Sequence, residues 1–246
     1  MAGSKDSLLI VDPRTPDSEV REIEAFGFKV VAAECLDFLY EGVKGHPDLQ
    51  FAPVGDRLIC HRGISLEKLK EFQGHGIECI PSLAALALPY PGHVILNASI
   101  GGGALIHRTD ITDGALIEEA IRQGLRLIDV RQGYGRCSTS YIGNGCFATN
   151  DSGVAAALSE NGFRVFISPY GDVELEGFDY GFLGGCLSSV VTGSDRLVLV
   201  SGNLNEYVMG RELREFIISS GAIPIEVGKG RLKDRGSVLQ VFKKRN

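Results

Sequence analysis

The chain has 246 residues, of which 44% are hydrophobic, and it carries a formal net charge of −6. This length and composition suit a globular protein with a large core, and the negative charge argues against a general nucleic-acid-binding protein, which is usually basic. No apolar run reaches the roughly 18 residues that a membrane span needs, and residues 1–6 lack the apolar stretch of a signal peptide. We therefore expect a cytoplasmic protein without nucleic-acid or membrane partners.

One unit recurs along the chain: an inner strand, a turn, a second strand, a helix and a third strand. The second strands are apolar runs that end in polar or turn-forming residues, as buried strands do. Self-similarity at a period of roughly 40 to 50 residues indicates a repeat architecture. The expected elements in successive units are 7–11, 18–26 and 28–33; 49–51, 57–60, 65–73 and 77–81; 93–99, 104–107, 113–123 and 125–130; 137–142, 146–149, 153–160 and 164–167; 187–191, 197–200, 206–219 and 223–227; and a last strand at 236–242.

The two ends of the chain are expected to complete one unit together. The N-terminal segment supplies strand, helix and strand without an inner strand ahead of them, and residues 236–242 supply one further strand. This predicts an α/β ring of five ββαβ units, closed by pairing of the N- and C-terminal strands. The alternative is an ordinary doubly wound sheet, but about three strand-like runs separate one helix from the next. No linker divides the chain, so residues 1–246 are expected to form one domain.

The six cysteines are scattered without paired CxxC spacing, which argues against a structural zinc site. Several stand in apolar strand contexts and are expected to be buried, free thiols of a reducing compartment. The run Gly101-Gly102-Gly103 reads as a hairpin turn between strands and not as a phosphate-binding loop that opens a helix. We therefore expect neither a metal nor an organic cofactor.

Three motifs carry a resemblance to a known fold. They are Gly45-His46-Pro47-Asp48-Leu49-Gln50, Arg131-Gln132-Gly133-Tyr134-Gly135-Arg136-Cys137-Ser138 and Tyr180-Gly181-Phe182-Leu183-Gly184-Gly185. With the repeated unit, they make the chain resemble the guanidino-group-modifying enzymes of the pentein fold, and more narrowly a bacterial family of unknown function with that fold. The resemblance implies five ββαβ units around a pseudo-fivefold axis.

Enzymes of this fold use a cysteine at the start of an inner strand, with a histidine and acidic residues on other inner strands. The thiolate attacks the guanidinium carbon, the histidine acts as acid and base, and carboxylates hold the nitrogens. The resemblance makes Cys137 the leading nucleophile, because it follows a glycine-rich turn and opens an inner strand. Cys186 is the rival at the same position of the next unit. The preceding Gly184 and Gly185 would permit close approach to a ligand, or tight packing at the axis.

His46 and Asp48 form a His-x-Asp pair at another inner-strand start. On a strand, residues two apart point to the same face, which suits an acid/base histidine beside an orienting carboxylate. Asp234 precedes the last inner strand, and Asp234 and Asn97 are candidates for substrate binding. Asp151 is expected to cap the helix that follows it. The remaining histidines are expected mostly at the surface or in turns: His61, His75, His93 and His107.

Three functions follow as hypotheses. The first is a cysteine-dependent hydrolase or amidinotransferase-like enzyme for a small guanidine or amidine, with Cys137, His46 and Asp48 as catalytic residues. The second is a non-catalytic ring that binds a small ligand or a partner protein, as some members of the fold do in ribosome-subunit biology. The third is a purely structural domain with a narrow or apolar axis. In the characterised enzymes the nucleophile lies in the final unit, whereas Cys137 lies in the middle of this chain.

Overall fold

The computed structural model describes residues 6–243 and contains five three-stranded sheets within them. Each sheet has a middle strand that pairs antiparallel with an inner strand and parallel with an outer strand. In the order inner, middle, outer, the sheets are β15 (Leu239–Phe242), β1 (Ser7–Val11) and β2 (Lys29–Ala32); β3 (Phe51–Val54), β4 (Arg57–Cys60) and β5 (Glu78–Pro81); β6 (Ser99–Gly101), β7 (Ala104–His107) and β8 (Arg126–Asp129); β9 (Thr139–Gly143), β10 (Cys146–Thr149) and β11 (Arg164–Ile167); and β12 (Leu187–Thr192), β13 (Asp195–Ser201) and β14 (Ile223–Val227).

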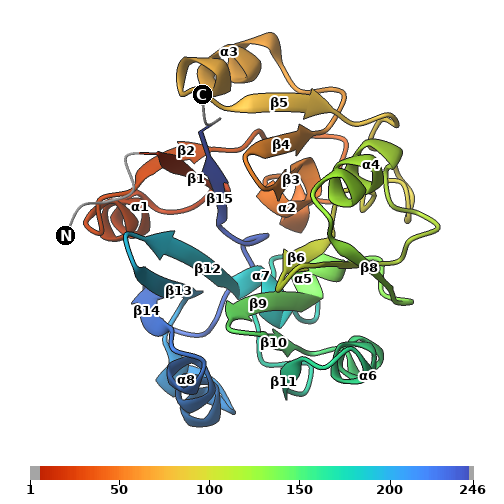
Figure 1. Ribbon diagram of the computed structural model, residues 1–246. Coiled ribbons are helices and arrows are strands. Elements are labelled where there is room, and N and C mark those ends of the chain that lie inside the picture. Colours follow the sequence, from red (N-terminus) through yellow and green to blue (C-terminus); the bar gives the residue numbers. More distant parts are fainter. Residues whose placement is uncertain (1–5, 244–246) are drawn as a thin grey trace.

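A helix joins the middle strand to the outer strand in every unit, as a parallel pair requires. Figure 1 shows these helices on the outside of the molecule, away from the centre where the inner strands lie. Asp151 caps one of them by accepting a hydrogen bond from the backbone N–H of Val154, which confirms its predicted role. The five helices are α1 (Asp17–Glu24), α3 (Leu66–Gly74), α4 (Gly114–Arg122), α6 (Ser152–Glu160) and α8 (Gly210–Ser219).

The two ends of the described chain pair as predicted. Strand β1 runs antiparallel to β15, with Ser7 opposite Phe242 and Ile10 opposite Leu239. Neighbouring inner strands contact one another in the order β3, β15, β12, β9 and β6. Figure 1 shows the resulting arrangement of five sheets about a common centre. Residues 1–5, on which the expectation of no signal peptide partly rested, lie outside the described part of the chain.

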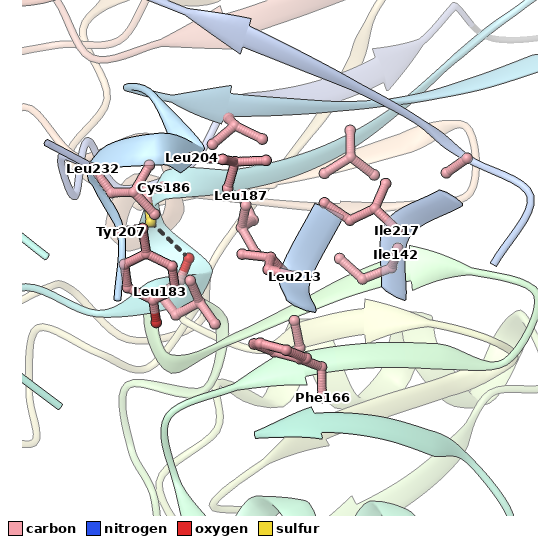
Figure 2. Packing of buried hydrophobic residues seen from close by; sticks show 14 of the residues in the cluster. Ile142, Phe166, Leu183, Cys186, Leu187, Leu204, Tyr207, Leu213, Ile217 and Leu232 are labelled. Atoms are coloured by element: carbon pink, nitrogen blue, oxygen red, sulfur yellow. Dashed lines mark hydrogen bonds between the residues drawn. The ribbon is translucent and has the colours of Figure 1, made fainter. Parts of the chain in front are cut away.

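Buried apolar clusters join neighbouring sheets. Figure 2 shows one of them, in which Ile142 and Phe166 from one sheet meet Leu187 and the helix residues Leu213 and Ile217 from the next. Full burial of a leucine or isoleucine side chain contributes about 1.5–3 kcal/mol. Four further clusters occupy the other junctions between sheets. The core is therefore distributed around the centre, which leaves the centre itself available for polar residues.

The inner-strand starts differ from the sequence-based expectation. Residues 137–142 were expected to be strand from their first residue, and His46 and Asp48 were expected to lie in extended spacing just before a strand at 49–51. Single helical turns lie at both places, and a third turn lies just before the strand that begins at residue 187. These turns are α2 (Pro47–Gln50), α5 (Gly135–Ser138) and α7 (Leu183–Cys186), and short 3-10 turns lie at η1 (Glu41–Val43) and η2 (Leu204–Glu206). The expected strand at 93–99 is also wrong, since β6 begins only at Ser99 and the N–H of Asn97 closes a turn on the carbonyl of Val94.

The helical turns have a tertiary cause. Pro47 suits the first helical position because it lacks the N–H that would be unpaired there, and the N–H of Asp48 donates to the carbonyl of Gly236 near the other end of the chain. In α5, the N–H groups of Arg136 and Cys137 donate to the side-chain oxygen of Asn97. These partners come from other units, so a local pattern could not predict them.

No helix of the described chain is long and apolar enough to cross a lipid bilayer.

Candidate active site

Cys137 lies at the centre of the molecule, in the turn α5, and contacts two polar side chains. Its Sγ lies 3.3 and 3.2 Å from the two carboxylate oxygens of Asp48, to which the thiol donates. The amide Nδ2 of Asn97 donates to the same sulfur over 3.2 Å. All three side chains are buried, with Cys137 3% exposed. The structure thus brings together the predicted nucleophile, the predicted orienting carboxylate and Asn97.

Asp48 is held in place from several sides. Its Oδ2 accepts a hydrogen bond of 3.0 Å from the hydroxyl of Ser237, and its backbone carbonyl accepts one of 3.0 Å from Asn97. Ser237 has a left-handed backbone with φ of 65°, which is uncommon for a residue other than glycine and often marks a functional position. Although Ser237 stands next to the predicted Asp234 motif, its role was missed because the side chain has no signal of its own in the sequence.

The imidazole ring of His46 has no hydrogen-bond partner among the described residues. Both ring nitrogens are buried and unpaired, and Nδ1 lies 3.9 Å from Oδ1 of Asp234. Burial lowers the pKa of His46, and the charge of Asp234 opposes this shift only in part. The imidazole is therefore neutral near pH 7 and able to accept a proton.

Asp234 serves the backbone as well as the site. Its two oxygens accept hydrogen bonds from the N–H groups of Phe182 (2.9 Å) and Gly236 (3.0 Å). Burial raises the pKa of this carboxyl, and the proximity of His46 lowers it. Asp234 thus links the start of α7, the approach to β15 and the imidazole of His46.

A half-buried guanidinium, that of Arg136, lies near the acidic residues of the site. The guanidinium of Arg136 donates to the carbonyls of Gly184 and Leu187, each at 2.8 Å. Burial raises the pKa of Asp48, and the charge of Arg136 is the largest influence in the opposite direction. Burial also raises the pKa of the Cys137 thiol, and the neighbouring Asp48 charge raises it further, whereas Asn97 lowers it. Both shifts favour the protonated forms, so the Cys137 thiol keeps its proton and shares a hydrogen bond with the carboxyl group of Asp48.

A cavity of about 290 Å³ opens next to the sulfur. Cys137, His46 and Asp234 contribute to its wall. The rings of Tyr134 and Phe182 lie 5.7 Å apart on the same wall. The rest of its lining is mostly apolar and holds neither Lys nor Arg: Val43, Leu49, Leu175, Phe178, Asp179 and Tyr180. A wall of aromatic rings and carboxylates suits a planar or cationic group.

Five predicted residues lie outside the lining of this cavity: Asp48 and Asn97, which contact the Cys137 sulfur, and Gly184, Gly185 and Cys186. The backbones of Gly184 and Gly185 serve packing: a Cβ on Gly184 would lie 2.4 Å from the carbonyl oxygen of Arg136, and one on Gly185 would lie 1.9 Å from Oδ1 of Asp234. Cys186 donates its thiol hydrogen to the carbonyl of Leu183 at 3.0 Å and packs in the apolar cluster of Figure 2. Of the two readings of the double glycine, the structure therefore supports packing at the axis.

The other histidines were expected mostly at the surface or in turns; three of the four are buried, although His93 does lie in a turn. His61, His93 and His107 are buried, with exposed fractions of 2%, 0% and 0%. His93 bonds through Nε2 to the hydroxyl of Tyr134 at 2.7 Å and so positions one wall of the cavity. His107 bonds to the carbonyl of Gly133, just before α5. Each ends or precedes an apolar run, and that position is a signal of burial that the sequence did contain.

The side chains also form a set of possible metal ligands. One ligand atom from each of His46, Asp48 and Cys137 lies within 4.8 Å of the others, and all three residues are buried. Imidazole nitrogen, carboxylate oxygen and thiolate sulfur are the ligand types that zinc takes in proteins. The same three residues can therefore be considered as a nucleophile with its acid/base partners or as a binding site for an ion.

Several solved structures share this fold. An agmatine deiminase from C. jejuni is 11% identical and aligns with a TM-score of 0.53 over 98% of this chain and 94% of its own. SxtG, an amidinotransferase from Microseira wollei, is 12% identical, with a TM-score of 0.53 over 100% and 97% of the two chains. A mutant dimethylarginine dimethylaminohydrolase from Pseudomonas aeruginosa in complex with citrulline is 11% identical, with a TM-score of 0.52 over 90% and 92%.

These similarities define the class of protein by its fold, which is the pentein fold that the sequence motifs predicted. The particular family follows from the sequence: residues 10–239 match the model of a family of unknown function, DUF6873, and the chain belongs to this family. No curated protein matches the sequence. At identities of 11–12%, the solved structures establish a shared fold and no more.

Proposed function

We propose that the protein is a cysteine-dependent enzyme that acts on a small guanidine or amidine, as a hydrolase or an amidinotransferase. The observation that carries the proposal is that Cys137, His46 and Asp234 line one cavity while Asp48 contacts the Cys137 sulfur. Cys137 is the nucleophile, His46 the acid and base, and Asp48 the orienting carboxylate. The fold shared with a deiminase and an amidinotransferase supports the same class.

The proposed chemistry needs no group beyond these residues. A guanidinium entering the cavity donates an N–H hydrogen bond to Asp234, which lines it. The thiol proton passes to His46, the sulfur bonds to the guanidinium carbon, and the resulting imidazolium lies next to Asp234. The C–N bond then breaks as His46 returns its proton to the departing amine. Water or a second amine attacks the covalent intermediate and releases the thiol.

A cationic substrate suits the resting charge of the site. The described cavity wall carries Asp179 and Asp234 and neither Lys nor Arg, so a positive group entering it is attracted to the wall. A nearby positive charge stabilises the thiolate and opposes the burial that keeps Cys137 protonated. In this proposal the nucleophile becomes reactive when the substrate arrives, and the free thiol is protected from oxidation between turnovers.

The proposal extends to the architecture and the location of the protein. The five sheets would form the pseudo-fivefold propeller of the pentein fold, and the pairing of β1 with β15 and the five clusters between sheets support closure. All six cysteines of the sequence lie in the described part of the chain and are free thiols. Free thiols are typical of a reducing compartment, which supports the cytoplasm.

A thiol-reactive amidine, such as a haloacetamidine, tests the proposal. The starting protein should carry Cys35→Ser and Cys79→Ser, because Cys35 is exposed and Cys79 is half-buried, so both would react with the probe. We expect one label per chain on Cys137, measured by mass spectrometry, and turnover of at least one member of a panel of arginine-like guanidines. Cys137→Ala should abolish both. Cys186→Ala is the matched control, since it removes an equally buried thiol outside the cavity lining.

The second candidate function is a non-catalytic ring that binds a small ligand. The observation in its favour is that the Cys137 thiol is buried and already bonded to Asp48. This candidate predicts a ligand that raises the melting temperature equally in the starting protein and in Cys137→Ser. Labelling that is indifferent to Cys137→Ala, together with no turnover of any guanidine, would reject the enzyme and leave this candidate.

A further inference from the structure

The unpaired imidazole of His46 calls for a partner. Both ring nitrogens are buried without a hydrogen bond, although the side chain lines the cavity. A buried polar atom without a partner is destabilising, and such atoms are rare in folded proteins. The nearest acidic oxygen, Oδ1 of Asp234, lies 3.9 Å from Nδ1, beyond hydrogen-bond distance. The ring is therefore free to bind something that enters the cavity.

The three nearest ligand atoms form a set suited to zinc. His46, Asp48 and Cys137 offer one nitrogen, one oxygen and one sulfur within 4.8 Å of one another. Zinc binds these atoms at about 2.0–2.3 Å in a tetrahedron, which places two ligands of one ion about 3.3–3.8 Å apart. A bound ion would therefore draw the three side chains together. The cavity that His46 and Cys137 line leaves room for a water as the fourth ligand.

The surroundings hold each of these ligands as metal sites usually do. Ser237 donates to Asp48 and Asn97 donates to Cys137. Asp234 lies on the Nδ1 side of His46, which leaves Nε2 for an ion. Carboxylates and hydroxyls that orient metal ligands in this way typically change affinity about 10–100-fold when they are removed.

We propose that His46, Asp48 and Cys137 bind one Zn²⁺ ion, and that the ion and a guanidine substrate exclude each other. Binding converts the Cys137 thiol to a bound thiolate and releases one proton, with no oxidation or reduction. The bound sulfur cannot attack a carbon, so zinc reversibly switches off the nucleophile. The binding part stands by itself, whereas the inhibitory part rests on the proposed function.

Cobalt is a visible probe for the binding part. We would titrate Co²⁺ into chelator-treated protein carrying Cys35→Ser and Cys79→Ser, the replacements of the two cysteines that are not buried, and then add Zn²⁺. We expect one Co²⁺ per chain, a sulfur-to-cobalt charge-transfer absorption and its loss on displacement by Zn²⁺. Cys137→Ala should remove the absorption, Asp48→Asn should weaken binding by more than about 100-fold, and Ser237→Ala should weaken it about 10–100-fold. Cys186→Ala should leave the absorption unchanged.

The outcomes separate the two proposals. Absence of the charge-transfer absorption, or its persistence in Cys137→Ala, overturns the zinc site whatever the enzyme does. The inhibitory part is read from the amidine label: Zn²⁺ should protect Cys137 from the probe, and a chelator should restore labelling. Zinc binding without protection overturns the inhibitory part. Turnover that Zn²⁺ does not slow also overturns it, whereas zinc binding in a protein without any turnover supports the site and rejects the enzyme.

Discussion

Two cysteines at matching positions of neighbouring units have opposite surroundings. Cys137 lies in α5 before β9, and Cys186 lies in α7 before β12. Both are buried, but Cys137 contacts a carboxylate and an amide beside a cavity, while Cys186 bonds to the carbonyl of Leu183 within an apolar cluster. The repeated backbone therefore does not fix the surroundings of a thiol. The side chains that arrive from other units do.

The largest expected effect concerns the asparagines that hold the two turns. Asn97 binds the N–H groups of α5, and Asn150 accepts from the N–H of Leu183 at the start of α7. Each replacement by alanine should lower the free energy of unfolding by about 3 kcal/mol, because at least two buried polar groups lose partners at about 1–3 kcal/mol each. Urea denaturation measures this loss.

The two asparagines should differ in their effect on chemistry. Only Asn97→Ala removes the amide that donates to Cys137, so only this variant should slow labelling by a haloacetamidine. Labelling slowed equally by Asn150→Ala would show that the reactivity of Cys137 reflects general stability and not its polar contacts.

The next effect is a pH dependence in the segment that leads to α5. His107 donates from Nε2 to the carbonyl of Gly133, and burial lowers its pKa to about 4. An unfolded histidine titrates near 6.5, so the native state resists protonation. The stability that depends on neutral His107 is fully present above about pH 6.5. It is lost as the pH falls from there toward 4. The loss amounts to about 2–3 kcal/mol at pH 4.5.

A histidine variant isolates this contribution from that of the other buried histidines. The free energy of unfolding should fall less between pH 7.5 and 4.5 in His107→Gln than in the unaltered protein, with a difference of about 2–3 kcal/mol. Equal falls in the two proteins would contradict the assignment to His107.

A smaller effect is expected where the two turns meet. A Cβ on Gly184 would lie 2.4 Å from the backbone nitrogen of Thr139 and 2.4 Å from the carbonyl oxygen of Arg136. Gly184→Ala should therefore destabilise the protein by about 1–3 kcal/mol through overpacking. Gly74→Ala is the control, because nothing lies within 4 Å of a Cβ there and alanine favours the helix. Thermal unfolding that ranks Gly74→Ala as the worse variant would argue against close packing of α5 on α7.

The smallest effect separates the hydroxyl of Ser237 from its backbone. Ser237→Ala and Ser237→Gly both remove the hydrogen bond to Asp48, but glycine adopts the left-handed φ of 65° without a steric penalty. We expect Ser237→Gly to be more stable than Ser237→Ala by about 1 kcal/mol, and both to react more slowly at Cys137. Equal stability of the two variants would show that the left-handed backbone at residue 237 does not affect the free energy of unfolding.

The sequence by itself determined the repeated unit, the buried middle strands, the outer helices and the pairing of the two ends. These features follow from local patterns, since apolar runs, caps such as Asp151 and terminal glycines act within a few residues. It also ranked Cys137, His46, Asp48, Asp234 and Asn97, because the repeat shows which residues begin the inner strands.

Only the tertiary structure decided how these residues meet. The strand spacing predicted that His46 and Asp48 share a face, but the helical turn α2 directs the two side chains to different partners. Asp48 contacts Cys137, and His46 lies near Asp234. The tertiary structure also placed Cys137, and not Cys186, in the lining of the cavity, and it added Ser237 to the contacts of Asp48. The physical reason is that each contact joins residues from different units, and the backbone turns that aim the side chains are held by hydrogen bonds across the centre.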